Sequence, residues 1–349
     1  MTASVEELRA RAREPNLRFV AGGAERAIRE LKGRIALVSQ PEPVAELDAA
    51  LVGRLASVSM AASLTIQALD ELLAGLPPID TVVGFGGGTA MDTAKYLAWR
   101  LGVPLVLLPS IVSVDASVTN TIAVRTGGGI EYRGFVVADA IIVDTELVGR
   151  APARLNRAGV GDLVSIHTAL WDWRAGDRVG RAAYRPEIAA RSAATLDRID
   201  QLADEIAAVS ARAIEVIVRG YAEVNALCLD VGNSQPEEGS EHYLGYQLEA
   251  LTGRSFVHGE LIGLATVTMA VAQDNDPMRP VRILDRCQVA WRPDEIGIEP
   301  ALLVRALQGL AAFVRQQRLP YSVVDETDLR AQAGAIVATV LDLAAAGAR

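Results

Sequence analysis

Short apolar runs alternate with helical stretches along the first 150 residues. Compact apolar runs of this kind are typical of buried strands, and they occupy 17–21, 34–39, 54–60, 79–84, 103–108 and 140–143. Patterns with helical periodicity cover 4–13, 24–31, 45–52, 63–76 and 91–101. This alternation predicts a parallel sheet with crossover helices. Between 121 and 144 the pattern is β-rich around Gly127–Gly129, which predicts a hairpin before the last strand.

The pattern changes near residues 150–157, where strand signals end. Ala-, Leu- and Ile-rich helical stretches follow at 160–174, 183–206, 208–229, 240–252, 259–273, 300–318 and 327–345. We therefore predict a Rossmann-like, nucleotide-binding α/β domain over residues 1–155 and an all-α domain over residues 156–349.

Composition narrows the class of protein. The chain has 349 residues, half of them hydrophobic, and a formal net charge of −9 with basic residues dispersed among acids. This argues against a nucleic-acid partner. The two cysteines fit a reducing compartment, the first residues lack the apolar core of a signal peptide, and no continuous apolar run reaches about 18 residues. We expect a cytoplasmic protein without membrane insertion.

Two of the three histidines, His242 and His258, flank a turn at Thr252-Gly253, and a carboxylate, Asp162, lies upstream. Two imidazoles and one carboxylate can hold a divalent metal with an open fourth position, which suits polarisation of a substrate oxygen. Spacing alone leaves an alternative open. His242 would then lie on a helix surface, His258 would fill a turn and Asp162 would cap a helix.

A glycine-rich loop, Gly86-Gly87-Gly88-Thr89, lies between a predicted strand and a predicted helix. Glycines let backbone N–H groups approach a phosphate, and the helix N-terminus adds favourable partial charge. The alternative is a tight turn that needs positive φ. The earlier strand 34–39 ends in Ser39-Gln40 without the acid that binds a ribose in NAD enzymes, so NADH and NADPH both remain open.

A second polar cluster follows the strand 103–108. It contains Ser110, Ser113, Asp115 and Thr119. Doubly wound domains bind ligands at the carboxyl ends of their strands, so Asp115 is a candidate for substrate hydroxyls and the hydroxyl residues are candidates for the cofactor. An ordinary capping and turn cluster is the alternative.

Five segments in order carry a resemblance that covers nearly the whole chain. They are GGGTAMDTAK, LPSIVSVDASVT, IIVDTELVGRAPARLNRAGVGD, GSEH and the triplet HGE. With them the chain resembles the superfamily of dehydroquinate synthase, glycerol dehydrogenase, sn-glycerol-1-phosphate dehydrogenase and the iron-containing alcohol dehydrogenases. The resemblance implies a dehydroquinate synthase-like fold, with a metal and a nicotinamide held between its two domains.

The resemblance also implies roles for individual residues. The family's metal ligands fall on Asp162, His242 and His258, and its pyrophosphate loop falls on the glycines at 86–88 and on Thr89. The family's D-x-x-K falls on Asp92 and Lys95, so Asp92 is assigned to the cofactor site together with Ser110, Ser113 and Thr119. Asp115 matches a substrate-pocket aspartate of the glycerol-type enzymes.

Branch-specific features favour a dehydrogenase. The sequence after the glycines, Asp-Thr-Ala-Lys, and the segment GSEH look most like the glycerol-1-phosphate branch. Family members often carry a second histidine four residues after His242, which is Tyr246 here, and this argues against the synthase. His167 is the only remaining histidine and is expected in the cleft wall or beside a ligand. Tyr246 and His167 are candidates for proton transfer.

We therefore predict a metal-dependent, NAD(P)-linked dehydrogenase acting on a small polyol or polyol phosphate. Zinc is expected, although the same ligands accept iron, nickel or manganese. A sugar-phosphate cyclase of the synthase type and a non-catalytic binding protein are the alternatives. We also expect a homo-oligomer, a dimer or larger.

Overall fold

The computed structural model describes residues 5–126 and 129–346, which group into two compact units. The first contains residues 1–156 and 210–222, and the second contains residues 157–209 and 223–349. The sequence predicted a single boundary between 155 and 156. The two compact units meet along the chain at residues 156/157, close to that position. They also meet twice within the helical half, at 209/210 and at 222/223, the latter inside the helix α13 (Ala211–Val231).

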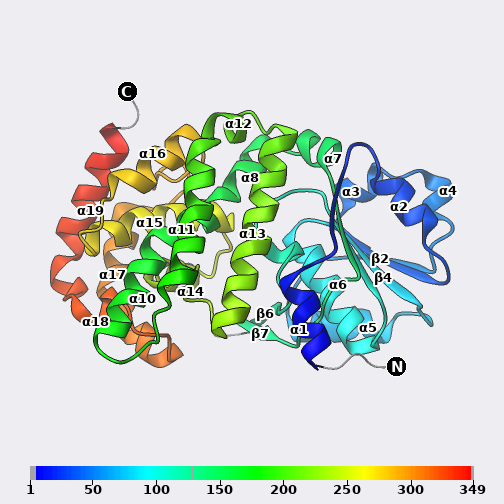
Figure 1. Cartoon of the computed structure of the whole chain (residues 1–349), viewed down its shortest axis with the longest axis horizontal. Coiled ribbons are helices and arrows are strands. Elements are labelled where there is room, and N and C mark those ends of the chain that lie inside the picture. Colours follow the sequence, from blue (N-terminus) through cyan, green and yellow to red (C-terminus); the bar gives the residue numbers. More distant parts are fainter. Residues whose placement is uncertain (1–4, 127–128, 347–349) are drawn as a thin grey trace. The chain divides into compact units, whose positions relative to one another are not determined.

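The first unit is built on a six-stranded parallel sheet with the strand order β1-β8-β5-β4-β2-β3. Two of its strands, β2 and β4, are labelled in Figure 1. Its strands are β1 (Leu17–Val20), β2 (Ile35–Ser39), β3 (Ser57–Met60), β4 (Thr81–Gly86), β5 (Leu105–Pro109) and β8 (Ala140–Asp144). Its helices are α1 (Val5–Arg13), α2 (Ala24–Glu30), α3 (Pro41–Ala45), α4 (Ala49–Val52), α5 (Ile66–Ala74), α6 (Gly88–Leu101) and α7 (Thr145–Arg150). The Rossmann-like class predicted from the sequence is confirmed.

Successive side chains along the strands point to opposite faces of the sheet, and helices cover both faces. Leu37, Phe85 and Leu108 belong to one buried cluster with side chains from α2, α4 and α7. The neighbouring position Gly84 faces the other side, where an added Cβ would lie 2.9 Å from the Cβ of Ala94 in α6. Every residue of β2 and of β5 is buried, as expected for strands covered on both faces.

The hairpin predicted within 121–144 is present as a separate antiparallel pair. It consists of β6 (Ile122–Thr126) and β7 (Gly129–Arg133). Its predicted turn at Gly127 and Gly128 lies outside the described residues.

The second unit is helical, as predicted. It contains α9 (Val160–Val164), α10 (Ile166–Arg178), α11 (Pro186–Gln201), α12 (Ala203–Ala207), α14 (Ser240–Thr252), α15 (His258–Ala272), α16 (Met278–Arg286), α17 (Pro300–Gln317), α18 (Val323–Glu326) and α19 (Leu329–Ala346). The helix α8 (Ala153–Ala158) crosses the division between the units. The single helix predicted at 160–174 is interrupted at Ser165, whose hydroxyl donates to the carbonyl oxygens of Asp162 and Glu237.

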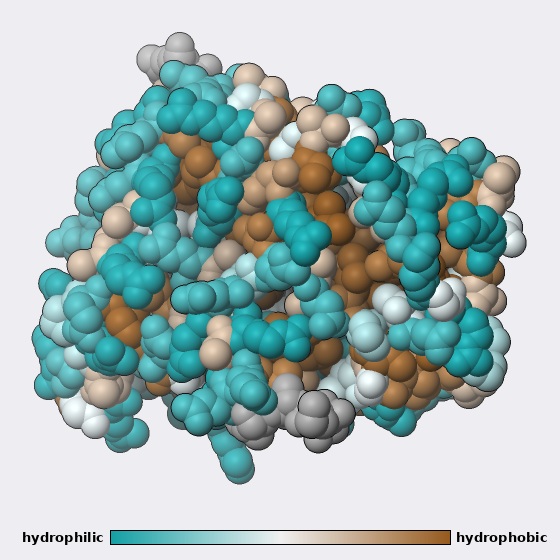
Figure 2. All heavy atoms as spheres, turned by 45° about the vertical axis from the view of Figure 1, so that its right-hand side comes forward, coloured by the Kyte–Doolittle hydropathy of each residue, from teal (hydrophilic) through white to brown (hydrophobic). Residues whose placement is uncertain are grey.

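One helix in the described part of the chain, α19, is long and apolar enough to cross a membrane by length and composition. The sequence prediction had found no such segment, because it counted only uninterrupted apolar runs. A third of this helix is buried, on a stripe that includes Leu329, Ala333, Ile336 and Val340. That spacing is the pattern of a helix that packs one face on a protein core. On the face of the molecule shown in Figure 2, hydrophilic residues are spread widely, with smaller hydrophobic areas between them.

Candidate metal centre and glycine loop

Three side chains far apart in the sequence come together in the second unit. They are Asp162 in α9, His242 in the first turn of α14 and His258 at the start of α15. One ligand atom from each lies within 4.8 Å of the other two. Nε2 of His258 is 3.1 Å from Oδ1 of Asp162, and the two imidazole centroids are 5.5 Å apart. The structure thus gathers the three residues that the sequence proposed as ligands.

A close approach of two glycines explains how Asp162 meets His258. Gly161 and Gly259 are the chain neighbours of these two residues, and they face one another across α9 and α15. A Cβ added to Gly161 would lie 2.6 Å from the Cα of Gly259 and nearer still to its carbonyl oxygen. A Cβ on Gly259 would meet the backbone of Ala158 in the same way. Only residues without a Cβ allow this separation between the helices.

The carboxylate of Asp162 tests whether a cation fits. The residue is 3% exposed, and neither of its oxygens has a hydrogen-bond partner among the described residues. The 3.1 Å approach of His258 does not meet hydrogen-bond geometry, so it leaves Oδ1 unsatisfied. A buried carboxylate without donors is costly unless a charge or donor compensates it. Its two oxygens beside two imidazoles form a suitable donor set for a divalent cation.

Glu241 fixes the orientation of His242. Its Oε1 is 2.9 Å from Nδ1 of His242, and both side chains are buried. The other oxygen, Oε2, accepts a hydrogen bond of 2.7 Å from the Thr168 hydroxyl. An ionised carboxylate only accepts, so the contact places a proton on Nδ1 and leaves Nε2 to face the centre.

Negative charge accumulates around this imidazole. Burial alone would lower the pKa of His242, but the carboxylates of Glu238, Glu241 and Asp162 raise it to about 9. The same charge that retains a proton there favours a divalent cation in its place.

A second buried carboxylate, Asp172, supports the start of α14. Its oxygens accept from the backbone N–H groups of Ser240 and Val323, at 2.8 and 2.7 Å. Burial, together with the nearby charge of Glu241, raises the pKa of Asp172 to about 7. Two carboxylates therefore stabilise the first turn of α14: Asp172 binds the N–H of Ser240, and Glu241 binds Nδ1 of His242.

The glycine loop of the first unit joins β4 to α6. Gly86 has φ +158°, and Gly88 lies so close to Val114 that an added Cβ would be 2.8 Å from its Cγ1. The backbone N–H of Gly87 donates to Oε1 of Gln40 at 3.0 Å. Gln40 follows β2, and its side chain therefore occupies the donor that the sequence assigned to a phosphate. Thr89 follows within the first turn of α6.

Asp92 and Lys95 form a buried ion pair beneath this loop. Nζ of Lys95 lies 2.7 Å from Oδ1 of Asp92, with side-chain exposures of 1% and 8%. Lys95 also donates to the Thr119 hydroxyl at 3.2 Å and to the carbonyl oxygen of Thr121 at 2.8 Å. Asp92 accepts from the N–H of Ala123. These contacts give Asp92 and Thr119 structural partners, and the cofactor contacts predicted for them stay predictions.

The other candidates of the first unit lie after β5. Ser110 is buried and Ser113 is half-buried. Asp115 begins a short 3-10 helix, Asp115–Ser117, and its carbonyl oxygen accepts from the N–H of Val118. Their predicted roles toward substrate and cofactor stay predictions.

Tyr246 and His167 occupy different surroundings. The Tyr246 ring lies 6.1 Å from the His242 ring, centroid to centroid, one turn further along α14. His167 bonds instead to the carbonyl oxygen of Asn275, 2.7 Å from its Nε2, and lines a cavity between α10 and α11. We therefore carry Tyr246, and not His167, into the proposed mechanism. Arg254, in the segment that precedes α15, is exposed, and its guanidinium lies over the Phe256 ring.

Sequence reasoning missed Glu241, Gln40 and the glycine pair. Glu241 stands beside His242 in GSEH, and adjacency to a proposed ligand was the one signal that pointed to it. Gln40 and Gly259 act through contacts with residues 47 and about 100 positions away, which spacing cannot reveal.

Comparison with known proteins identifies a family match and similar enzymes. A family described as iron-containing alcohol dehydrogenase matches residues 44–152. Glycerol-1-phosphate dehydrogenase (NAD(P)+) of Hyperthermus butylicus is 31% identical over 273 residues, covering 78% of this chain and 76% of the relative. The enzyme of the same name from Methanothermobacter thermautotrophicus is 27% identical over 279 residues, 80% of each chain.

Solved structures share the fold. Glycerol dehydrogenase from Schizosaccharomyces pombe has a TM-score of 0.69 at 20% identity, with 95% of this chain and 90% of that chain covered. Sulfoacetaldehyde reductase from Bifidobacterium kashiwanohense, solved with NAD+, has a TM-score of 0.63 at 17% identity, with 93% and 97% covered. With these relatives, the chain belongs to the iron-containing alcohol dehydrogenase family, on the branch of the glycerol-1-phosphate dehydrogenases.

Proposed function

We propose that this chain is a metal-dependent, NAD(P)-linked dehydrogenase that transfers hydride between the nicotinamide and a small polyol phosphate. The first substrate pair is sn-glycerol 1-phosphate and dihydroxyacetone phosphate, the chemistry that the names of its relatives describe. The observation that carries the proposal is the convergence of two imidazoles on a buried Asp162 whose oxygens lack donors among the described residues.

Asp162, His242 and His258 would hold the cation, and zinc is the proposed ion. Iron, nickel and manganese accept the same nitrogen and oxygen donors. A divalent cation at this position supplies Lewis-acid polarisation of a substrate hydroxyl or carbonyl oxygen. Glu241 holds the His242 ring in the orientation that presents Nε2.

The glycine loop would hold the pyrophosphate of the cofactor. Gln40 must first release the N–H of Gly87, which it now binds, so cofactor binding includes movement of this amide. Gln40 carries no charge that would repel a 2′-phosphate, and the proposal therefore includes both NADH and NADPH. Asp115 is proposed to accept hydrogen bonds from substrate hydroxyls, and Tyr246 to move the hydroxyl proton.

The test is the absorbance of NADH or NADPH at 340 nm after addition of dihydroxyacetone phosphate to the zinc-loaded protein. The proposal expects cofactor oxidation that is lost in His242→Ala and retained in Leu251→Ala, an exposed position on the same helix. No oxidation with this substrate or with a panel of small ketones would contradict it. Release of phosphate from a sugar phosphate without net cofactor turnover would assign a cyclase instead.

We also propose that the protein works in the cytoplasm as a homo-oligomer. The two cysteines among 349 residues fit a reducing compartment and support the first statement. Light scattering on the purified chain measures its mass, and a value of 37.0 kDa, the mass of one chain, would contradict the second.

A further inference from the structure

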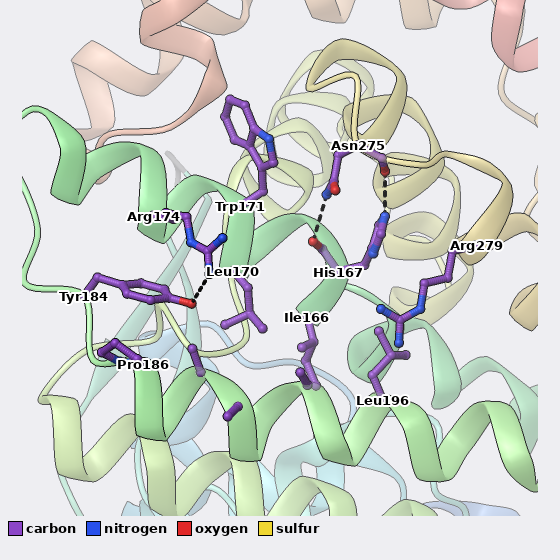
Figure 3. A pocket seen from close by; sticks show the side chains of 13 residues that line it. Ile166, His167, Leu170, Trp171, Arg174, Tyr184, Pro186, Leu196, Asn275 and Arg279 are labelled. Carbon is purple, nitrogen blue, oxygen red and sulfur yellow. Dashed lines mark hydrogen bonds between the residues drawn. The ribbon is translucent and has the colours of Figure 1, made fainter.

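A cavity of about 390 Å³ lies between α10 and α11 in the second unit (Figure 3). Its volume falls in the range of small-ligand sites, about 300–1,000 Å³. None of the three proposed metal ligands lines it. Asn275, at one end of the cavity, follows the C-terminus of α15, whereas His258 begins that helix. The 15 residues of this helix span about 22 Å, which separates the Asn275 end of the cavity from His258, whereas His167, on α10, lies five residues after Asp162.

The sequence of α11 explains why this space is not filled. The face of α11 toward the cavity carries Ala189, Ala190 and Ala193, at helical spacing. The opposite wall, on α10, carries larger side chains, among them Leu170 and Trp171. Methyl groups on one wall cannot reach the other, and an open apolar slot remains between the helices.

One end of the cavity is lined by a positively charged side chain, Arg174, which contacts Tyr184. Arg174 lies over the Tyr184 ring, 5.1 Å from its centroid, and donates to the tyrosine oxygen at 3.2 Å. Tyr184 is itself fixed edge-on against the buried Trp173, with centroids 5.0 Å apart. Within the described part of the chain, no carboxylate lies within 4.0 Å of this guanidinium. Its charge is therefore available to an anion.

The other end combines a second cation with an acceptor. Arg279 lies there and forms an ion pair of 2.7 Å with Asp197, which does not line the cavity. His167 lies between the two arginines in Figure 3, and its Nε2 must donate to the carbonyl oxygen of Asn275. Burial, and the nearby charge of Arg279, lower the pKa of His167. A neutral imidazole that donates from Nε2 offers Nδ1 as an acceptor.

We propose that this cavity binds a small organic anion with an apolar body, such as an aryl or short-chain phosphate ester. The apolar body lies along the alanines of α11 and Trp171, and Arg174 contacts the anionic group. A guanidinium recognises phosphate and carboxylate oxygens through paired N–H groups. Nδ1 of His167 is a further acceptor for ligands that also carry a hydroxyl group, and binding of the apolar body and the anion does not require it. This site is independent of the proposed hydride transfer.

Calorimetric titration of phenyl phosphate into the full, metal-free chain tests the proposal. We expect saturable binding that weakens at least about tenfold, or about 1.4 kcal/mol, in Ala193→Leu, which fills the slot. The same loss is expected in Arg174→Gln. Ala194→Leu, one position along α11 and not part of the lining, is the matched control for the filled cavity. Both leucine variants must keep the circular dichroism of the parent chain.

Two further probes separate the parts of the site. Inorganic phosphate and neutral phenol should each bind at least about tenfold more weakly than phenyl phosphate, because each lacks one half of the proposed recognition. Absence of saturable binding, or equal binding by the parent and Ala193→Leu, would overturn the proposal. Self-association that Ala193→Leu abolishes would assign the cavity to a second copy of the chain, and this result would also overturn it.

Discussion

Replacement of Gly161 by alanine probes the contact that brings Asp162 to His258. The added Cβ would lie 2.6 Å from the Cα of Gly259, where an ordinary contact needs at least 3.4 Å. The backbones of α9 and α15 must therefore separate by at least about 0.8 Å, and by more to clear the nearer carbonyl oxygen. Metal sites tolerate about 0.2 Å in their ligand distances. The displacement is several times larger than this tolerance.

We expect Gly161→Ala to lower zinc affinity by at least about 10- to 100-fold, the loss found when support of a ligand is removed. The metal-free variant should also lose about 1–3 kcal/mol from overpacking, partly offset by the gain of about 1 kcal/mol that alanine brings to a helix. At a free zinc concentration of 100 times the parent dissociation constant, zinc stabilises the parent by about 2.7 kcal/mol. A 100-fold weaker site would lose most of this.

Chelator competition measures the zinc affinity, and thermal unfolding with and without zinc measures both stability effects. Gly334→Ala is the matched control, because nothing lies within 4 Å of its added Cβ in α19. It should bind zinc as the parent does and unfold at the same or a higher temperature. Unchanged zinc affinity in Gly161→Ala, with the fold retained, would refute the reasoning that this crossing places the two ligands.

Three other changes have expected outcomes. Glu241→Ala should weaken zinc binding about 10- to 100-fold, measured by the same competition. Thr168→Val, which keeps the carboxylate, should lose less zinc affinity. A zinc affinity of Glu241→Ala equal to that of the parent would show that Glu241 does not orient His242. In the metal-free protein the folded pKa of Asp172, about 7, exceeds the unfolded value of 3.8, so its contribution is complete below pH 3.8 and is lost as pH rises toward 7. The free energy of unfolding in urea should therefore fall with pH by up to about 1.4 kcal/mol per pH unit more in the parent than in Asp172→Asn, and identical pH profiles would contradict the assignment. Lys95→Met leaves Asp92 buried and unpaired and should cost about 3–5 kcal/mol in urea unfolding, with recovery when Asp92→Leu is added; a cost below about 1 kcal/mol would show that the pair is not maintained.

The strands of the first unit were predictable because each is a short apolar run that is visible in the local sequence. The runs at 34–39 and 103–108 are continuous and apolar, as strands buried on both faces require, and both became central strands of the sheet. Helix boundaries were less predictable. The break at Ser165 depends on a hydroxyl bond to Glu237, a partner 72 positions away that no local pattern contains.

The candidate metal site was likewise predictable only in part. Residue types and motif order indicated which three side chains could meet, but not what brings them together. The approach of Gly161 to Gly259, the Glu241 contact to His242 and the Gln40 contact to Gly87 are tertiary interactions. Local propensity was also silent on Asp92. Its assignment to the cofactor site stays a prediction, and the structure adds a buried ion pair with Lys95, three residues along the same helix.

The most direct test of the central claim is the zinc content of the reconstituted and dialysed chain, measured by mass spectrometry for the parent and for His242→Ala. The account predicts about one zinc ion per chain in the parent and less than about 0.1 in the variant, because two remaining donors cannot retain the ion. A parent protein without zinc, or a variant that retains as much as the parent, would contradict it.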